Sequence, residues 1–253
     1  MLKKIVIVSV LAAQLNCAAV LPIKRDAEAK IILKLAQPFL PEDPVILEAG
    51  AYNGADTDEI AQTWPKGIVH AFEPQPEIFK QLKNNLKPRT NVKVYELGLS
   101  DYVGTATFYD SVHDYQPDQP FASGSLLQPK EHLALSPFVK FNRQFEVPIT
   151  TLPVWAKQAG VTKIDFMWLD LQGLELVVLK AATDLLKTTR VVYTEVEFVE
   201  AYKGQHQYSA VKAWLEGQGF VLYAADFTAE QAAQPNCDIW YGNAMFVKKE
   251  LLK

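Results

Sequence analysis

The sequence has little cysteine, no excess of basic residues and no long apolar run. Its 253 residues include two cysteines and carry 25 Lys and Arg against 29 Asp and Glu, a net charge of -4. A chain with this charge has no excess of positive charge to attract a polyanion, so we predict that it has no nucleic-acid partner. We predict small or neutral substrates instead. Internal repeats and low-complexity tracts are also absent. A chain of this length without a break in composition is typical of one large domain.

The first 19 residues differ in kind from the rest. Two lysines precede an apolar run over residues 5–15, and NCAA follows at 16–19. This order is typical of a secretory signal peptide cleaved after Ala19, and the run is too short to span a bilayer comfortably. A retained apolar segment packed on the domain is the alternative, and any membrane association would come through this segment alone. Cleavage would leave Cys237 as the only cysteine, which excludes an intramolecular disulfide.

Residues 45–54, VILEAGAYNG, have the pattern of a strand followed by a glycine turn. The first residues are apolar and β-branched, as in a buried strand, and the two glycines permit a tight turn. A helix is predicted over 56–64, with three acids in its first turn. A second strand over 68–72 then ends at Glu73. This acid lies nineteen residues beyond Gly54, about where a nucleotide-binding βαβ unit carries the acid that binds ribose hydroxyls.

The glycine spacing of this turn does not suit a dinucleotide. A pyrophosphate is bound by G-x-G-x-x-G at a helix N-terminus, whereas Gly50 and Gly54 form G-x-x-x-G with Glu48 in front. Carboxylates at this position would repel a phosphate but suit an ammonium or a sulfonium. S-adenosylmethionine has both cations and a ribose diol without a phosphate, so we predict it as the cofactor. An ordinary α/β turn with a solvent-facing Glu73 is the alternative.

Further helices and strands alternate along the first half of the chain. Helices are predicted over 27–39 and from Pro76 onwards, because apolar residues recur there at helical spacing. A third strand is predicted over 91–96. The turn GLSD at 98–101 follows it, at the edge where an open parallel sheet binds its ligand. This turn would form hydrogen bonds with the edge of an adenine, and a plain turn is the alternative. Residues 104–109 are predicted to form a hairpin strand with the residues before them.

Residues 111–150 show no clear period and contain five prolines. Loops of this length in a compact domain are usually functional or disordered, and the aromatic residues here argue against disorder. We therefore predict an insertion that acts as a lid or binds the acceptor. His113, His132 and Arg143 are candidates for contacting an acceptor, although each taken singly fits an ordinary surface residue.

The second informative stretch is KIDFMWLDLQGLELVVLKAA at 163–182. It predicts a buried strand that ends at Asp170, a glycine turn and a helix. A fifth strand over 191–194 ends at Glu195. Both acids would lie at the carboxyl edge of a doubly wound sheet, where such sheets bind ligands. The remaining predicted elements are a helix and two strands: 209–217, 220–225 and 243–247.

These stretches together resemble the FkbM-type methyltransferases, a branch of the class I S-adenosylmethionine-dependent enzymes. The resemblance covers about residues 45–247. It rests on EAGAYNG at 48–54, FEP at 72–74, LSD at 99–101 and, most specifically, IDFMWLDLQGLELVVLKAA at 164–182. It implies an α/β fold with a Rossmann-like, doubly wound sheet of seven strands, mostly parallel with the last strand antiparallel. It also implies methyl transfer, usually to a hydroxyl oxygen of a sugar or other small acceptor.

The resemblance assigns roles to individual residues. Asp170 would face the sulfonium and the acceptor. The methionine end would be bound by Glu48, Gly50, Asn53 and Gly54. The ribose would be bound by Glu73, with Pro74 beside it. The adenine would be bound by Leu99, Ser100 and Asp101. Three positions depart from the family: Trp168, Gln172 and Ala181, the last of which stands where Gly usually precedes Ala182. Trp168 stands where Lys is often found, which removes a charge from the fourth strand, and Gln172 stands where Glu is common.

Methyl transfer to a hydroxyl requires alignment of the acceptor oxygen, the methyl group and the sulfur, and removal of a proton. Asp170 is the best-placed general base, with Glu195 and Glu175 as second choices. Glu175 also fits an acid that simply favours the start of a helix. Asp170 and Glu195 could instead share a Mg²⁺ that acidifies a bound hydroxyl. Acids that contact cofactor and acceptor directly, without a metal, are the alternative.

Two other functions fit parts of the pattern. An exported module that binds a cofactor or glycan without turnover agrees with the signal-like N-terminus and the altered fourth strand. An NAD-dependent oxidoreductase has a similar sheet, but the missing middle glycine and the acids of the first turn count against it. A signal-like N-terminus and a cofactor made in the cytosol point to different compartments, so the sequence leaves localisation open, and it says nothing of the oligomeric state.

Overall fold

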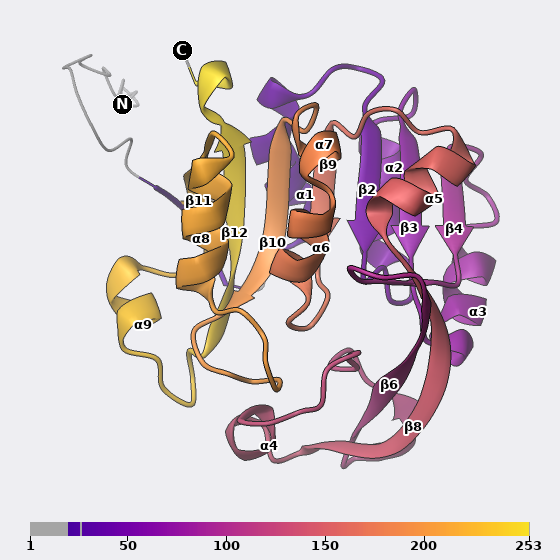
Figure 1. Cartoon of the computed structure of the whole chain (residues 1–253), viewed down its shortest axis with the longest axis vertical. Helices are drawn as coiled ribbons and strands as arrows, with labels where there is room; N and C mark the ends of the chain where they lie inside the picture. The colour runs from indigo at the N-terminus through magenta and orange to yellow at the C-terminus, as the bar shows by residue number, and fades with distance from the viewer. Residues whose placement is uncertain (1–19, 26, 253) are drawn as a thin grey trace, which may run out of the picture.

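The computed structural model describes residues 20–25 and 27–252, so the predicted signal peptide at 1–19 lies outside the described residues. Within the described ranges, no helix has the length and apolar character needed to cross a bilayer. A large central sheet carries helices on both faces, and a smaller second sheet lies below it in Figure 1.

The central sheet has the strand order β1-β11-β12-β10-β9-β2-β3-β4. Its strands are β1 (Leu21–Pro22), β2 (Val45–Ala49), β3 (Ile68–Phe72), β4 (Val92–Tyr95), β9 (Phe166–Leu169), β10 (Val191–Glu197), β11 (Phe220–Ala225) and β12 (Tyr241–Lys248). All pair in parallel except β12, which is antiparallel to both β10 and β11. The predicted doubly wound sheet with an antiparallel last strand is therefore confirmed. The described sheet has eight strands rather than seven, because the two-residue β1 adds to the edge beside β11.

Helices cover both faces of this sheet. One face carries α1 (Ala29–Ala36), α2 (Ala55–Thr63) and α3 (Pro76–Asn85), and the other carries α5 (Leu152–Ala159), α6 (Glu175–Ala181), α7 (Thr183–Leu186) and α8 (Tyr208–Gly217). The shorter helical segments are η1 (Gln37–Phe39), α4 (His132–Leu135), α9 (Ala229–Ala233) and η2 (Lys249–Leu251). The helix predicted over 27–39 is shorter than expected. It ends in the 3-10 turn η1, where Pro38 cannot donate a backbone hydrogen bond.

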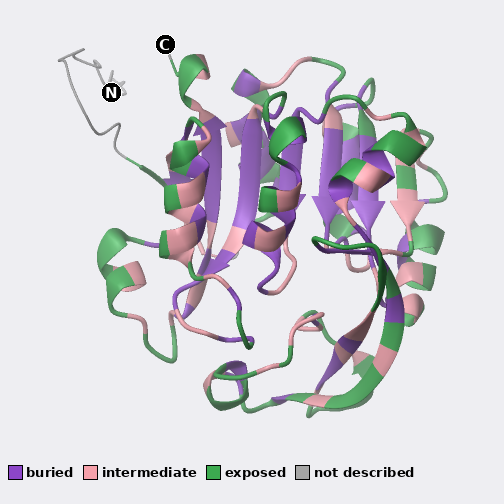
Figure 2. Ribbon diagram, viewed as in Figure 1, coloured by how far each residue is buried: buried purple, intermediate pink, exposed green. Residues whose placement is uncertain are grey.

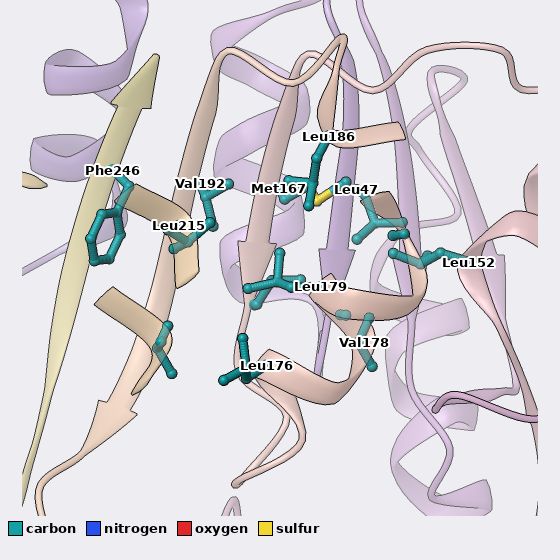
Figure 3. Close-up of a cluster of buried hydrophobic side chains, with 14 of the residues drawn as sticks. Leu47, Leu152, Met167, Leu176, Val178, Leu179, Leu186, Val192, Leu215 and Phe246 are labelled. Atoms are coloured by element: carbon teal, nitrogen blue, oxygen red, sulfur yellow. The ribbon is translucent and has the colours of Figure 1, made fainter. Parts of the chain in front are cut away.

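The core forms where side chains of the parallel strands meet α6 and α8. Leu47 of β2 and Met167 of β9 belong to one buried cluster with Leu179 of α6, Leu186 of α7 and Leu215 of α8 (Figure 3). Figure 2 shows the central strands buried and the outer side of the second sheet exposed. Strands buried on both faces read as continuous apolar runs, which explains why they could be found from the sequence.

The second sheet consists of β5 (Gly98–Leu99), β6 (Gly104–His113), β7 (Gln116–Pro120) and β8 (Val139–Thr150), in the order β5-β8-β6-β7. We call residues 104–150 the arm. The predicted hairpin between 104–109 and the preceding residues is wrong. β6 pairs antiparallel with β8, from Gly104 opposite Ile149 to His113 opposite Val139. The local pattern could not show a partner so distant in sequence. Figure 1 shows the arm curving beneath the carboxyl ends of the central strands.

Replacing Leu179 by Ala should lower the free energy of unfolding by about 2–5 kcal/mol, because a fully buried leucine leaves a cavity when it is truncated. Urea unfolding monitored by circular dichroism measures the change. Leu133→Ala in the arm is the matched control, since that leucine is 50% exposed. Equal stability of the Leu179 variant and the unaltered protein would contradict the packing of α6 described here.

Candidate active site

A cleft lies between the carboxyl ends of β2, β3 and β9 and the arm. It contains about 700 Å³ of empty space that is continuous with solvent. The side formed by the central domain includes Gly50, Tyr52, Glu73, Pro74, Gln75, Leu99, Asp170 and Gln172. The side formed by the arm includes Phe108, Asp110, Phe121, Ala122, Gly124, Ser125 and Leu126. The arm therefore closes one side of the ligand crevice expected at this edge of the sheet.

The turn after β2 can be built only with glycine at position 50. Gly50 has φ of 85°, and a Cβ atom there would lie 1.8 Å from the carbonyl oxygen of Asp170. Its N–H donates to the carbonyl oxygen of Phe72 (3.0 Å), as does that of Ala51 (2.9 Å). Because no side chain intervenes, the ends of β2, β3 and β9 approach one another closely. Gly54, also at positive φ, begins α2 without lining the cleft.

Glu73 is held in place at the end of β3 by two backbone groups. Its Oε2 accepts the N–H of Tyr52 (3.0 Å), and its Oε1 accepts the N–H of Gln75 (2.8 Å). Each carboxylate oxygen retains acceptor capacity for a hydroxyl group of a ligand. Burial raises the pKa of Glu73 to about 8, and the negative charges of Asp170 and Asp110 add to the rise. The side chain is thus fixed, lines the cleft and is sensitive to any cation that enters.

Tyr52 joins this turn to the arm. Besides its backbone contact with Glu73, its hydroxyl donates to the carbonyl oxygen of Pro120 at the end of β7 (3.1 Å). Its φ of 46° is unusual for a residue other than glycine. Sequence reasoning missed Tyr52, because no local pattern indicates a contact with a strand so far along the chain.

Glu48 is buried in β2 and does not line the cleft. Burial raises its pKa to about 8, and the charges of Asp56 and Asp170 contribute. Among the described residues, its Oε2 has no hydrogen-bond partner. Its neighbour across the strand pair is Trp168, which packs in the core against Tyr193 with ring centroids 4.5 Å apart. Where the family often has Lys, this chain therefore places an apolar ring beside a buried acid.

The remaining predicted cofactor residues divide between the cleft and other places. Pro74 and Leu99 line the cleft, whereas Asn53, Ser100 and Asp101 are not among its lining residues. The side chain of Asn53 accepts the N–H of Ala55 (3.1 Å). The hydroxyl of Ser100 donates to Asp101 Oδ1 (3.3 Å). The structure thus brings Gly50, Glu73, Pro74 and Leu99 together, and the binding roles of all these residues stay predictions.

Gln172 connects the two acids that were predicted to act in catalysis. Its Nε2 donates to Asp170 Oδ1 (2.7 Å) and to Glu195 Oε2 (2.6 Å). Its Oε1 lies 2.6 Å from the hydroxyl of Tyr202, which can donate to it. The backbone oxygen of Gln172 accepts the hydroxyl proton of Ser125 in the arm (2.8 Å). Gln172 therefore fixes the carboxylate of Asp170 at the cleft and ties this loop to the arm.

Asp170 and Glu195 form a close pair of acids whose pKa values are affected differently by their surroundings. Burial raises the pKa of both. Hydrogen bonds from Gln172 and Glu195 oppose the rise for Asp170, whereas the neighbouring charge of Asp170 raises the pKa of Glu195 further. Asp170 is thus the more acidic partner and lines the cleft, while Glu195 lies behind it. Glu195 is not at the end of its strand as expected, because the pairing of β10 with β12 continues to Glu197.

Two further acids are buried near this pair. Glu175 accepts the N–H groups of Leu171 (2.7 Å) and Gly173 (3.1 Å), which closes the turn before α6. Its contacts are those of a structural acid, and burial raises its pKa to about 7. Glu197 is 1% exposed and, within the described ranges, neither of its carboxylate oxygens has a hydrogen-bond partner. Burial raises the pKa of Glu197 well above its usual value.

A Mg²⁺ shared by Asp170 and Glu195 is not supported. The side-chain amide nitrogen of Gln172 donates hydrogen bonds to both carboxyl groups. Mg²⁺ is bound by oxygen ligands, and an N–H donor between the two acids is not such a ligand. In the part of the chain that the structure describes, no group of three or more His, Cys, Asp and Glu residues is placed to hold a metal ion.

The candidate acceptor residues of the arm have other partners. His132 is buried in an aromatic cluster with Phe141, Tyr202 and Trp240, and burial lowers its pKa to about 4. Arg143 donates to the buried carboxylate of Asp110 (Nε to Oδ2, 2.7 Å). Neither His132 nor Arg143 lines the cleft, but Asp110 does.

The residues of the cleft fit a cation without a phosphate. Glu73, Asp110 and Asp170 line it, and no Lys, Arg or His occurs among its described lining residues. A pyrophosphate needs amide or cationic donors, so NAD does not fit this set. S-adenosylmethionine fits it, because the carboxylates complement its two cations and Glu73 can accept ribose hydroxyls.

Comparison with known proteins agrees with this chemistry. Residues 48–222 match the family described as the methyltransferase FkbM domain. This chain belongs to that family. It is 34% identical to the 2-O-methyltransferase NoeI of Sinorhizobium fredii, over 72% of this chain and 75% of that protein. It is 26% identical to methyltransferase sdnD of Sordaria araneosa, over 76% of this chain and 78% of that protein.

One solved structure that matches this chain shows a weak similarity. Fibrillarin of Aeropyrum pernix with natively bound S-adenosyl-L-methionine is 12% identical, with a TM-score of 0.47 over 86% of this chain and 74% of that one. This similarity is too low to compare individual residues. The FkbM methyltransferase assignment rests on the match in sequence and on the order of the strands.

The buried acids predict that the free protein becomes more stable as the pH falls from about 8 to about 5. In this window a carboxyl group with a raised pKa is protonated when folded and ionised when unfolded, so folding takes up protons. Glu197→Gln should reduce the slope of unfolding free energy against pH by up to about 1.4 kcal/mol per unit. Urea unfolding at several pH values measures both slopes. Stability that rises with pH in this window would contradict the assignment.

Proposed function

We propose that this chain is an S-adenosylmethionine-dependent methyltransferase that methylates a hydroxyl oxygen of a sugar or other small acceptor. The observation that carries the proposal is the position of Asp170, which lines the same cleft as Glu73. Membership of the FkbM methyltransferase family and the similarity to a protein named as a 2-O-methyltransferase support it.

Binding of the cofactor would use the acids and the apolar side chains of the cleft. Glu73 accepts the ribose hydroxyls, since both its oxygens are already oriented by backbone N–H groups. Pro74 and Leu99 provide apolar contacts for the adenine. When bound, S-adenosylmethionine supplies a methyl group on a sulfonium. Its positive charges favour the ionised forms of Glu73 and Asp170, so binding offsets the cost of their burial.

Asp170 then acts as the general base for the acceptor hydroxyl. Burial raises the pKa of Asp170 above its usual value, and a carboxylate with a raised pKa accepts a proton more readily than an exposed one. The amide of Gln172 keeps the Asp170 carboxylate oriented and ionised. Glu195 supports it from behind through the same amide and does not contact the cleft. The arm completes the site by holding the acceptor in line with the methyl group.

The alternative of a binding module without turnover is not favoured by the position of Trp168. This residue is the clearest departure from the family block, yet it is buried in the core between β2 and β10 and does not line the cleft. Its change leaves the described lining of the cleft intact. The catalytic candidate Asp170 is present and oriented.

Glu73→Gln should weaken the binding of S-adenosylmethionine by about 1–3 kcal/mol, because the ribose hydroxyls lose a charged acceptor. Titration calorimetry measures the affinity. Glu96→Gln is the matched control, since Glu96 is exposed next to β4 and does not line the cleft. If both variants bind as tightly as the unaltered protein, Glu73 does not contact the cofactor.

Asp170→Asn should reduce methyl transfer by about 10²- to 10⁴-fold while changing cofactor affinity much less, because it removes the proton acceptor and keeps the shape. Transfer is measured as label passing from methyl-labelled S-adenosylmethionine into a small-molecule extract of the source cells. Asp118→Asn, on the exposed strand β7, is the control. An equal loss of transfer and affinity would assign Asp170 to binding. Cofactor binding by the unaltered protein without transfer into any extract would favour the module without turnover.

A further inference from the structure

Aromatic side chains gather at the end of the arm around His113. The centroid of its ring lies 5.1 Å from that of Tyr115, 5.1 Å from that of Phe138 and 5.5 Å from that of Phe121. These residues come from the end of β6, the turn before β7, the residue before β8 and the residue after β7. We call His113, Tyr115, Phe121 and Phe138 the aromatic shelf.

The shelf is exposed to solvent, unlike most aromatic side chains of the protein. Tyr115 is 87% exposed, Phe138 is 44% exposed and Phe121 is 37% exposed. Within the described residues, Tyr102 is the other aromatic side chain with comparable exposure. Three exposed rings at one place form an apolar patch, and such patches usually mark a binding surface.

Backbone hydrogen bonds hold the shelf in a fixed arrangement. The N–H of Phe121 donates to the carbonyl oxygen of Ser111 (2.7 Å), and the Ser111 hydroxyl donates back to the carbonyl oxygen of Phe121 (2.8 Å). The N–H of Asp114 donates to the carbonyl oxygen of Phe138 (2.9 Å). Rings carried by an ordered backbone lose little freedom when a ligand covers them.

The shelf is continuous with the cleft through Phe121. This ring lines the cleft together with Asp170, and it also contacts His113 of the shelf. An acceptor with its reacting hydroxyl at Asp170 that extends past Phe121 would therefore reach the shelf at His113. The shelf is thus placed to contact a part of the acceptor that does not react.

The chemistry of the shelf suits a sugar ring. The face of an aromatic ring is electronegative and attracts the C–H groups on the apolar face of a pyranose, while the hydroxyl groups of the sugar remain in water. An aliphatic chain gains most when apolar surface encloses it on several sides, and these exposed rings offer one side. Asp114 and Lys140 beside the shelf form an ion pair (3.7 Å). The two charges offset each other, so this pair does not favour an ionic ligand.

We propose that the aromatic shelf binds a sugar ring of the acceptor other than the ring that is methylated, and that the acceptor is a neutral oligosaccharide. The proposal rests on the proposed function, because that function places the reacting hydroxyl at Asp170. It adds a second contact region, which favours an oligosaccharide over a single sugar.

Two measurements on Tyr115→Ala, Phe138→Ala and the exposed control Tyr102→Ala test the proposal. Calorimetry with S-adenosylhomocysteine first tests the cofactor site, and all three variants should bind it as the unaltered protein does. Each protein, in the presence of excess S-adenosylhomocysteine, is then applied to an array of neutral oligosaccharides and the matching monosaccharides. We expect oligosaccharides to be retained over monosaccharides, with affinity roughly two- to tenfold weaker for each shelf ring removed and unchanged for the Tyr102 variant.

The outcomes separate this proposal from the proposed function. Binding of S-adenosylhomocysteine without retention of any oligosaccharide would overturn the shelf proposal and leave the cofactor assignment intact. Equal binding by the shelf variants and the unaltered protein would also overturn it, as would retention of acyl-chain probes in place of glycans. Shelf-dependent binding of oligosaccharides without binding of S-adenosylhomocysteine would support a glycan site and contradict the methyltransferase function.

Discussion

Burial of carboxylic acids at or near the carboxyl ends of the central strands is the constraint on which the site depends. Glu48, Glu73, Asp170 and Glu195 have raised pKa values because the sheet and its surroundings exclude water from them. Backbone N–H groups and the amide of Gln172 supply part of the lost solvation. The part of the lost solvation that these groups do not replace makes the cleft favourable for a positively charged ligand and unfavourable for a phosphate. In the proposed function, the choice of cofactor and the general-base role of Asp170 both depend on this burial.

The arm completes this site from a distant part of the sequence. Tyr52 contacts Pro120, and Gln172 contacts Ser125, so two loops of the central sheet are tied to the arm. The arm also contributes Asp110 to the cleft and carries Phe121 to its edge. In the proposed function, the central sheet provides the cofactor crevice and the arm, which lines one side of the cleft, selects the acceptor.

Much of the central fold could be predicted from the sequence, because its signals are local. Apolar β-branched runs identify the buried strands, and Gly50 marks a turn that no other residue can adopt. The family block around Asp170 identifies the edge of the sheet at which the cleft lies. The pairing of β6 with β8 and the roles of Tyr52 and Asp110 were missed, because they depend on contacts between residues far apart in sequence. The Mg²⁺ hypothesis is not supported, and the contacts of Gln172 with both acids could not be predicted from the sequence because they appear only in three dimensions.

Titration calorimetry of the purified protein with S-adenosylmethionine and, separately, with NAD tests the central claim most directly. The acid-lined cleft predicts saturable binding of S-adenosylmethionine and no measurable heat with NAD at neutral pH. Saturable binding of NAD together with no heat from S-adenosylmethionine would contradict the account.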